Sequence, residues 1–131
     1  MRMDLPSLLA VGCGAFLGAV LRWMLGLWLN PLFPTLPLGT LGANLLGGLL
    51  MGMAIGVLSQ FDALSPAARL FFTTGFLGGL TTFSTFSAET VTLMLRQQYA
   101  WTLAIVGAHV AGTLAMTLAG IALVRAVGGA R

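Results

Sequence analysis

The sequence predicts an all-α membrane protein with four transmembrane helices, forming a single domain over residues 1–131. Three observations support this fold class. Mean hydropathy is +1.00, and only 7% of the residues are charged, against about a quarter in soluble domains. Six basic and three acidic residues are too few to cover a water-soluble fold. Four stretches also approach the length of about 20 apolar residues that crosses a hydrocarbon core.

The four predicted spans follow one another with short links. The first covers about 7–29 and is followed by one asparagine and three prolines. It is too long for the apolar core of a secretory signal, about 7–15 residues, and contains Arg22, so we retain it as a helix. The second span covers 39–58 and ends in a polar link over 59–66. The third and fourth cover 70–95 and about 100–124.

The basic residues lie near the ends of the spans and form no continuous run. Lipid headgroups therefore explain them better than nucleic acid. Four spans place both termini on one side of the membrane. That side carries Arg2, Arg69, Arg125 and Arg131, against Arg96 on the other, which mildly favours cytoplasmic termini. The lone Cys13 excludes an internal disulfide and a multi-cysteine metal site.

Small residues recur at four-residue spacing in every span. The pairs and ladders are Gly14 and Gly18; Gly48, Gly52 and Gly56; Gly75 and Gly79; and Ala108 and Gly112. Such grooves allow membrane helices to approach closely. They can pack within one subunit, but four short helices have few mutual faces. We therefore expect some of them to meet a second subunit.

Residues 75–89 predict a third helix that is broken mid-membrane. Their sequence is GFLGGLTTFSTFSAE. Adjacent glycines followed by two threonines are poor helix formers. We predict arms over 70–77 and 82–95. A break frees carbonyls that suit a small hard cation, and N–H groups that suit an anion. The alternative is a packing kink whose hydroxyls bond back to the helix.

Two phenylalanines and their neighbouring hydroxyls follow the predicted break. Phe83 and Phe86 are three residues apart and share a helical face. They can face lipid or core, or they can turn their electropositive ring edges toward an anion. Ser84, Thr85 and Ser87 place hydroxyl donors beside the rings.

Polar residues also recur at four-residue spacing on the second and fourth spans. Thr40 and Asn44 share one stripe, and the Asn44 amide can either cement helices or present N–H donors to an anion. His109, Thr113 and Thr117 share the other stripe. Their side chains can pack and bond back to the helix, or they can line a pathway.

Two charged residues lie within the spans, where charges are functional candidates. Arg22 either extends toward the membrane surface or holds a positive potential at a pore mouth. Glu89 is expected to bond with hydroxyls, for example that of Thr85 one turn back. The sequence has no catalytic serine, histidine and aspartate set, no zinc-protease motif and no phosphate-binding loop, so we expect no enzyme.

These motifs resemble the Fluc family of fluoride channels, also called CrcB proteins. The resemblance covers about 14–120 and is carried by residues 18–23 (GAVLRW), 38–44 (LGTLGAN) and, most specifically, 75–89. It implies an antiparallel, dual-topology homodimer with two pores. It also implies a structural sodium ion held by the backbone carbonyls of Gly78 and Thr81.

The resemblance further implies which side chains form the fluoride pathway: Asn44, Phe83, Phe86, Ser84, Thr85, Glu89, Thr113 and Thr117, with Arg22 matching the family's first-helix arginine. We also assign Thr40 and His109 to this pathway. There are two departures, because His109 stands where the family tends to carry a hydroxyl and Ile105 where it commonly carries a tyrosine.

The expected function is passive fluoride export across the bacterial inner (cytoplasmic) membrane, which confers fluoride resistance. Fluoride enters as neutral hydrogen fluoride, and the electrically negative interior drives the anion out. The expected partners are fluoride, a second copy and the lipid bilayer, without nucleic acid. One alternative is a proton-coupled exporter of lipophilic cations, for which Glu89 is the candidate carboxylate. A structural membrane protein is the other.

Overall fold

The structure is a computed structural model that describes residues 3–60 and 64–129, and every regular element within these ranges is helical. The elements are α1 (Leu5–Leu29), the short 3₁₀ turn η1 (Asn30–Leu32), α2 (Leu38–Gln60), α3 (Pro66–Arg69), the π-helical segment η2 (Leu70–Leu77), α4 (Gly78–Leu80), α5 (Phe83–Leu95) and α6 (Tyr99–Gly128).

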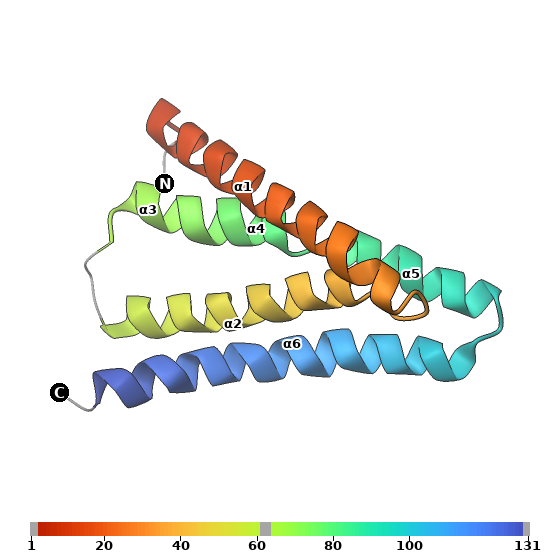
Figure 1. Cartoon of the computed structure of the whole chain (residues 1–131). Helices are drawn as coiled ribbons and strands as arrows, with labels where there is room; N and C mark the ends of the chain where they lie inside the picture. Colours follow the sequence, from red (N-terminus) through yellow and green to blue (C-terminus); the bar gives the residue numbers. More distant parts are fainter. Residues whose placement is uncertain (1–2, 61–63, 130–131) are drawn as a thin grey trace.

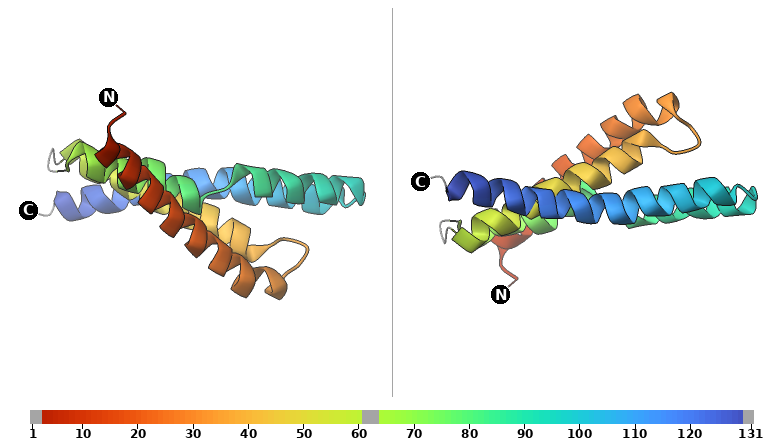
Figure 2. Two further views of the ribbon diagram at one scale, coloured as in Figure 1. Left: turned by 90° about the horizontal axis from the view of Figure 1, so that it is seen from above. Right: turned by 90° about the horizontal axis from the view of Figure 1, so that it is seen from below.

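The helices form two hairpins, one of α1 and α2 and the other of α5 and α6, and the turns of the two hairpins diverge at one end of the molecule (Figure 1, Figure 2). The first and last described residues, the end of α2 and the start of α3 lie at the other end of the molecule (Figure 1). α2 runs alongside α6, while α1 packs across η2 and α4. At the opposite end, the hairpin of α1 and α2 splays away from the hairpin of α5 and α6 (Figure 2).

The long helices extend slightly beyond their predicted bounds, and a capping side chain explains the earlier start of α1. α1 begins at Leu5, since Asp4 Oδ1 accepts a hydrogen bond of 2.9 Å from the Ser7 amide. Hydrogen bonding to Ser7 lowers the pKa of Asp4. α2 continues to Gln60 and α6 to Gly128. Part of the predicted 59–66 link, together with Arg2 and Arg131, lies outside the described residues.

The third span begins earlier than predicted and contains two extended residues. Ser65 caps α3 by accepting from the Ala68 amide at 3.2 Å, so the first arm starts at Pro66. It continues past residue 77 because the Thr81 amide still donates to the Leu77 carbonyl at 3.0 Å. Thr81 and Thr82 then adopt extended backbone angles, and helix resumes with α5.

The glycine pairs named above pack helices together within the subunit. A Cβ at Gly18 would collide with the carbonyl of Phe76, and a Cβ at Gly79 with that of Ala15, so α1 and the η2–α4 arm touch backbone to backbone. A Cβ at Gly52 would likewise strike the Thr117 carbonyl on α6. The structure therefore uses these grooves between helices of one chain. Contact of some small residues with a second copy stays a prediction.

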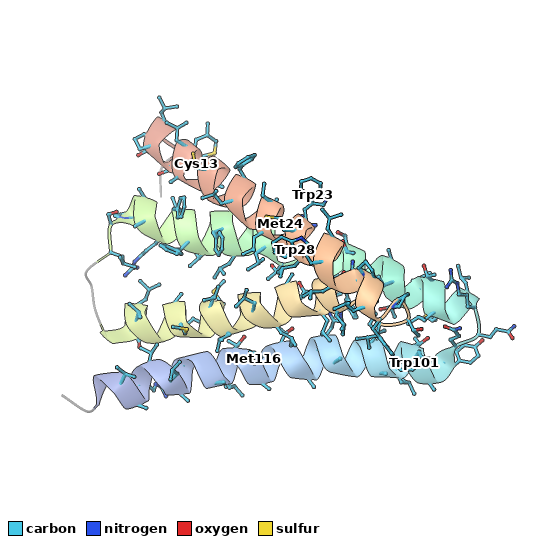
Figure 3. All side chains as sticks on the ribbon, viewed as in Figure 1. Cys13, Trp23, Met24, Trp28, Trp101 and Met116 are labelled. Atoms are coloured by element: carbon cyan, nitrogen blue, oxygen red, sulfur yellow. The ribbon has the colours of Figure 1, made fainter. Side chains whose placement is uncertain are left out.

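The outer surface is apolar, as a lipid-facing surface should be. Three helices of the described chain are long and apolar enough to cross a membrane: Leu5–Leu32, Leu38–Ser59 and Tyr99–Gly128. The third predicted span is not among them, because the extended residues Thr81 and Thr82 divide it into shorter helices. Large side chains such as Trp23 and Trp28 on α1 are more than half exposed (Figure 3). Such exposure is unfavourable in water but not against lipid tails. The chain is an all-α membrane protein.

Candidate functional site

The site is centred on the two extended residues between α4 and α5. There, Asn44 of α2 holds the main chain of Thr82 by a pair of hydrogen bonds. The Thr82 amide donates to Asn44 Oδ1 at 2.7 Å, and Asn44 Nδ2 donates to the Thr82 carbonyl at 3.0 Å. Both residues are buried. The side-chain oxygen thus replaces the helical acceptor that the Thr82 N–H has lost, and the side-chain nitrogen adds a second donor to the carbonyl that begins α5.

Asn44 also connects this backbone to the fourth span. Its Nδ2 lies 3.0 Å from Nδ1 of His109, which is only 4% exposed. Both hydrogens of the amide nitrogen are therefore engaged within the subunit. Asn44 was expected either to join helices or to present N–H donors to an anion. The contacts described here join helices.

A groove of about 480 Å³ runs along the break between α2, the two arms and α6. Its lining brings together Asn44, Gly47, Gly48, Met51, Thr73, Leu77, Gly78, Thr81, Thr82, Phe83, Phe86, His109, Val110, Thr113, Leu114 and Thr117. Most of the predicted pathway residues thus border one space, although they come from three separate spans.

Aromatic rings form one side of this groove. The rings of Phe83 and Phe86 meet nearly edge to face, with centroids 5.3 Å apart and planes at 71°. Phe86 is 7% exposed and lies 4.6 Å from the His109 ring, while Phe83 is 77% exposed. Phe86 is therefore an internal residue, whereas Phe83 presents its ring to the open side of the groove.

Hydroxyl groups surround the start of α5. Thr82 Oγ1 caps the helix by accepting from the Thr85 amide at 3.2 Å. The same hydroxyl lies 3.0 Å from Thr85 Oγ1 and 3.3 Å from Ser84 Oγ. The predicted hydroxyl cluster is therefore organised around Thr82.

Glu89 bonds with a different hydroxyl from the one we suggested. Its Oε1 accepts from Thr40 Oγ1 at 2.6 Å, and the Thr85 hydroxyl bonds to Thr82 instead. The beginning of α2 packs against α5 and brings the buried Thr40 within reach. The other carboxylate oxygen, Oε2, is buried without a hydrogen-bond partner among the described residues.

A second pocket of about 370 Å³ lies beside Glu89 at the divergent end of the molecule. It is lined by Pro34, Thr35, Pro37, Thr85, Ala88, Glu89, Thr92, Leu93, Arg96 and Gln98. Thr40 and Asn44, one helical turn apart on α2, bond to groups in this pocket and in the main groove respectively. Hydrogen bonds from one polar stripe of α2 therefore reach residues that line both spaces.

Arg22 occupies neither space but binds the carboxyl end of the first arm. Its Nε donates to the Gly79 carbonyl at 3.0 Å. In a continuous helix, the Phe83 amide would donate to this carbonyl. The extended residues Thr81 and Thr82 interrupt the helix and remove that hydrogen bond. A guanidinium at a helix carboxyl end also interacts favourably with the helix dipole. This contact is with the backbone. The two roles suggested for Arg22, extension toward the membrane surface and a positive potential at a pore mouth, stay predictions.

Gly78 and Thr81 border the main groove and lie within two residues of Gly79 in sequence. The carbonyls in this last turn lose their α-helical partners, because the Thr82 amide bonds Asn44 and the Thr85 amide bonds the Thr82 hydroxyl. Backbone oxygens suit a hard cation, so the residues fit a sodium ion in kind. Within residues 3–60 and 64–129, no cluster of histidine, cysteine and acidic side chains offers a metal site.

The fourth-span residues combine the two roles that we considered. His109, Thr113 and Thr117 all border the main groove. Thr117 Oγ1 also bonds back to the Thr113 carbonyl at 3.0 Å. Back-bonding and lining therefore coexist on this stripe.

Two site residues escaped the sequence prediction. Thr82 was predicted only as the start of an arm, although a threonine before a helix start is a capping signal. Asn30 was interpreted as an interruption, yet its Oδ1 accepts from the Gly39 amide at 2.8 Å and the Thr40 amide at 3.3 Å. It thereby caps α2 and supports the turn that carries Thr40.

Fold and site together define an integral membrane protein with a polar, partly aromatic groove at an irregular stretch of backbone. Comparison with known proteins identifies its family. A family model described as CrcB-like protein, Camphor Resistance (CrcB), matches residues 9–121. The chain therefore belongs to the CrcB-like family, as the resemblance predicted.

Curated relatives align over most of the chain. A fluoride-specific ion channel FluC of Nitrosospira multiformis is 63% identical over 123 residues, which cover 94% of this chain and 96% of the relative. Channels of the same name from Aromatoleum aromaticum and Chromohalobacter salexigens are 57% and 60% identical, covering 91% and 88% of both chains. The family is one of ion channels, which confirms the prediction that the chain is not an enzyme.

Proposed function

We propose that this protein is a fluoride-selective channel that exports fluoride passively across the bacterial cytoplasmic membrane and so confers fluoride resistance. The names of the relatives support fluoride as the ion. The groove that joins Phe83, Phe86 and His109 at the irregular backbone is the observation that carries the proposal. Irregular backbone at membrane depth is tolerated where it is buried in protein or borders a watery cavity.

The pathway follows the polar stripe of α2. It runs from the Glu89 pocket, past Thr40 and Asn44, into the groove that holds the two rings and the fourth-span residues. Ring edges are electropositive and can face an anion. Ser84, Thr85, Thr113 and Thr117 supply hydroxyl donors. Fixed donors in a narrow path replace part of the hydration shell of fluoride, and they favour this small anion over chloride.

Arg22 acts in this proposal through the backbone. Its bond to Gly79 holds the end of the first arm while leaving the neighbouring carbonyls of Gly78 and Thr81 available. These two carbonyls from each of two copies would bind one structural sodium ion. Hard cations bind several oxygen ligands at once, so the two oxygens of a single copy are too few, and a second copy doubles their number.

The second copy is proposed to insert with opposite orientation, which gives an antiparallel homodimer with two pores. The exposed Phe83 and the open side of the main groove support such a partner. Few basic residues distinguish the two ends of the subunit, so the positive-inside rule favours one orientation only weakly.

Fluoride efflux from liposomes that contain the purified protein tests the proposal. A fluoride electrode should record rapid release after the membrane potential is collapsed with valinomycin, while chloride is retained. We expect Phe83→Ile and Phe86→Ile to slow efflux at least about tenfold, because an isoleucine fills space but lacks an electropositive edge. The exposed, lipid-facing Leu118→Ile serves as the matched control.

Two outcomes would contradict the proposal. Absence of fluoride release by the folded wild-type protein would exclude the channel. Normal release by both phenylalanine variants would exclude the aromatic pathway and leave the hydroxyl stripe as the remaining candidate.

A further inference from the structure

The hydrogen bonds around Asn44 determine where the proton of His109 resides. A backbone amide can only donate, so the atom of Asn44 that faces the Thr82 amide must be the oxygen. A backbone carbonyl can only accept, so the atom that faces the Thr82 carbonyl must be the nitrogen. These two backbone contacts fix the orientation of the side-chain amide, which would otherwise be a matter of interpretation.

The same nitrogen of Asn44 faces Nδ1 of His109 at 3.0 Å. Because an amide nitrogen only donates, Nδ1 must accept and carries no proton. The neutral imidazole then has its hydrogen on Nε2. The clamp on the Thr82 backbone thus selects one tautomer of the histidine.

Nε2 is buried and has no hydrogen-bond partner among the described residues. The side chain as a whole is 4% exposed, borders the main groove, and stacks on Phe86. Buried donors without a partner are rare in proteins and call for an explanation. The histidine that carries this fixed N–H donor therefore borders the groove beside the aromatic rings.

We propose that the Nε2–H of His109 is a direct hydrogen-bond donor to the permeating anion, and that Asn44 keeps it in the donor form. The inference rests on the proposed fluoride function and specifies one ligand atom within it. A hydroxyl can rotate and either donate or accept. The Nε2–H of this histidine can only donate, so this position accepts an anion and offers nothing to a cation.

The chain has a single histidine, so its nitrogens can be observed without assignment. Full-length protein, purified with a histidine-free tag, is labelled with ¹⁵N-histidine and studied by NMR in lipid. We expect an unprotonated Nδ1 and a protonated Nε2. Sodium fluoride should shift the Nε2 signal and its proton saturably, and sodium chloride at equal concentration should not.

Variants provide a second measurement. His109→Phe keeps a ring but removes the donor, and it should reduce fluoride efflux about tenfold, the effect of losing one hydrogen bond of typical strength. His109→Gln keeps an N–H donor and should retain more efflux than His109→Phe. The exposed Val106→Leu, nearly one turn earlier on α6 and outside the groove, should conduct as the wild type does.

The NMR result on the unaltered protein decides the inference even if a variant fails to fold. A proton on Nδ1, an Nε2 signal that ignores fluoride, or an equal response to chloride would each overturn it. If the same preparation still releases fluoride, the channel function stands and only the role of His109 is wrong. If it releases none, the proposed function itself has failed.

Discussion

At the scale of residues, the side-chain amide of Asn44 bonds the main chain of Thr82 where the helix is interrupted. The Thr82 N–H has lost its helical acceptor and donates to Asn44 Oδ1 in its place, while Asn44 Nδ2 also donates to the Thr82 carbonyl. In a membrane interior, no water is present to hydrogen-bond an unpaired backbone group, so the free-energy cost of leaving that group unpaired is higher. The polarity of Asn44 is therefore required by the backbone conformation as well as by any ion.

Replacing Asn44 by alanine tests this structural role. Asn44→Ala leaves the buried N–H of Thr82 without an acceptor. It also removes the side-chain donor to the Thr82 carbonyl, which still accepts the first hydrogen bond of α5 as its N-cap. Each unsatisfied group costs about 1–3 kcal/mol, so we expect a clear loss of thermal stability in detergent, with the His109 Nε2 signal also altered. Ser87→Ala, at an exposed position on α5, is the control. Equal melting temperatures for the two variants would show that the clamp contributes nothing.

The carboxyl end of α4 depends on a single cation. Arg22→Met should destabilise the protein by about 1.5–3 kcal/mol, typical of a hydrogen bond to a charged group, because the Gly79 carbonyl loses its donor. Arg22→Lys should recover part of this loss, since it keeps a charge but not the geometry of the guanidinium. Thermal unfolding in detergent measures both.

A control separates this contact from the general effect of removing a charge. Arg125 lies in the last turn of α6 and is exposed. Arg125→Met should lower the free energy of unfolding by much less than Arg22→Met does. The same loss in both variants would refute a specific role for the Arg22 bond.

At the scale of elements, glycines set the distances between helices. α1 meets the η2–α4 arm through Gly14 and Gly18 on one side and Gly75 and Gly79 on the other. In lipid, association depends on close van der Waals packing rather than on burial from water. Small residues at these contacts are therefore the main source of helix pairing.

Two alanine substitutions on the same helix test this packing. In Gly18→Ala, the new methyl group meets the Phe76 carbonyl, so α1 must shift, and we expect a destabilisation of about 1–3 kcal/mol. In Gly12→Ala, the methyl group has no atom within 4 Å. This variant should be neutral or up to about 1 kcal/mol more stable, because alanine favours helix. The reverse order of stabilities would disprove the packing model.

At the scale of the whole molecule, the subunit has an open face. The two helical hairpins diverge at one end (Figure 2), and the main groove opens beside the exposed Phe83. The first and last described residues lie at the opposite end (Figure 1). If two copies insert with opposite orientation, each membrane surface receives one of each end.

Single cysteines at opposite ends test this arrangement. In a Cys13→Ser background, Gln98→Cys lies in the turn before α6, and Leu64→Cys lies at the α3 end. A membrane-impermeant maleimide added to intact cells should label about half of either variant, because the weak charge bias allows both orientations. Full labelling of one variant and none of the other would establish a single orientation instead.

The sequence alone determined what depends on composition and on local spacing. Hydropathy specified a membrane fold, the bounds of the long helices were correct to within a few residues, and the three-residue spacing placed Phe83 and Phe86 side by side. The run from Gly75 to Glu89 also contained enough information for the family to be predicted. These features are local because helix formation and lipid partitioning act on neighbouring residues.

Only the tertiary structure decided which distant groups meet. Periodicity could not show that Thr40, 49 positions away, bonds Glu89 in place of the nearby Thr85. It also could not show that Asn44 bonds both Thr82 and His109. Such partners are set by the packing of α2 between the third and fourth spans. Packing depends on the shapes of several helices together, so no single stretch of sequence specifies it.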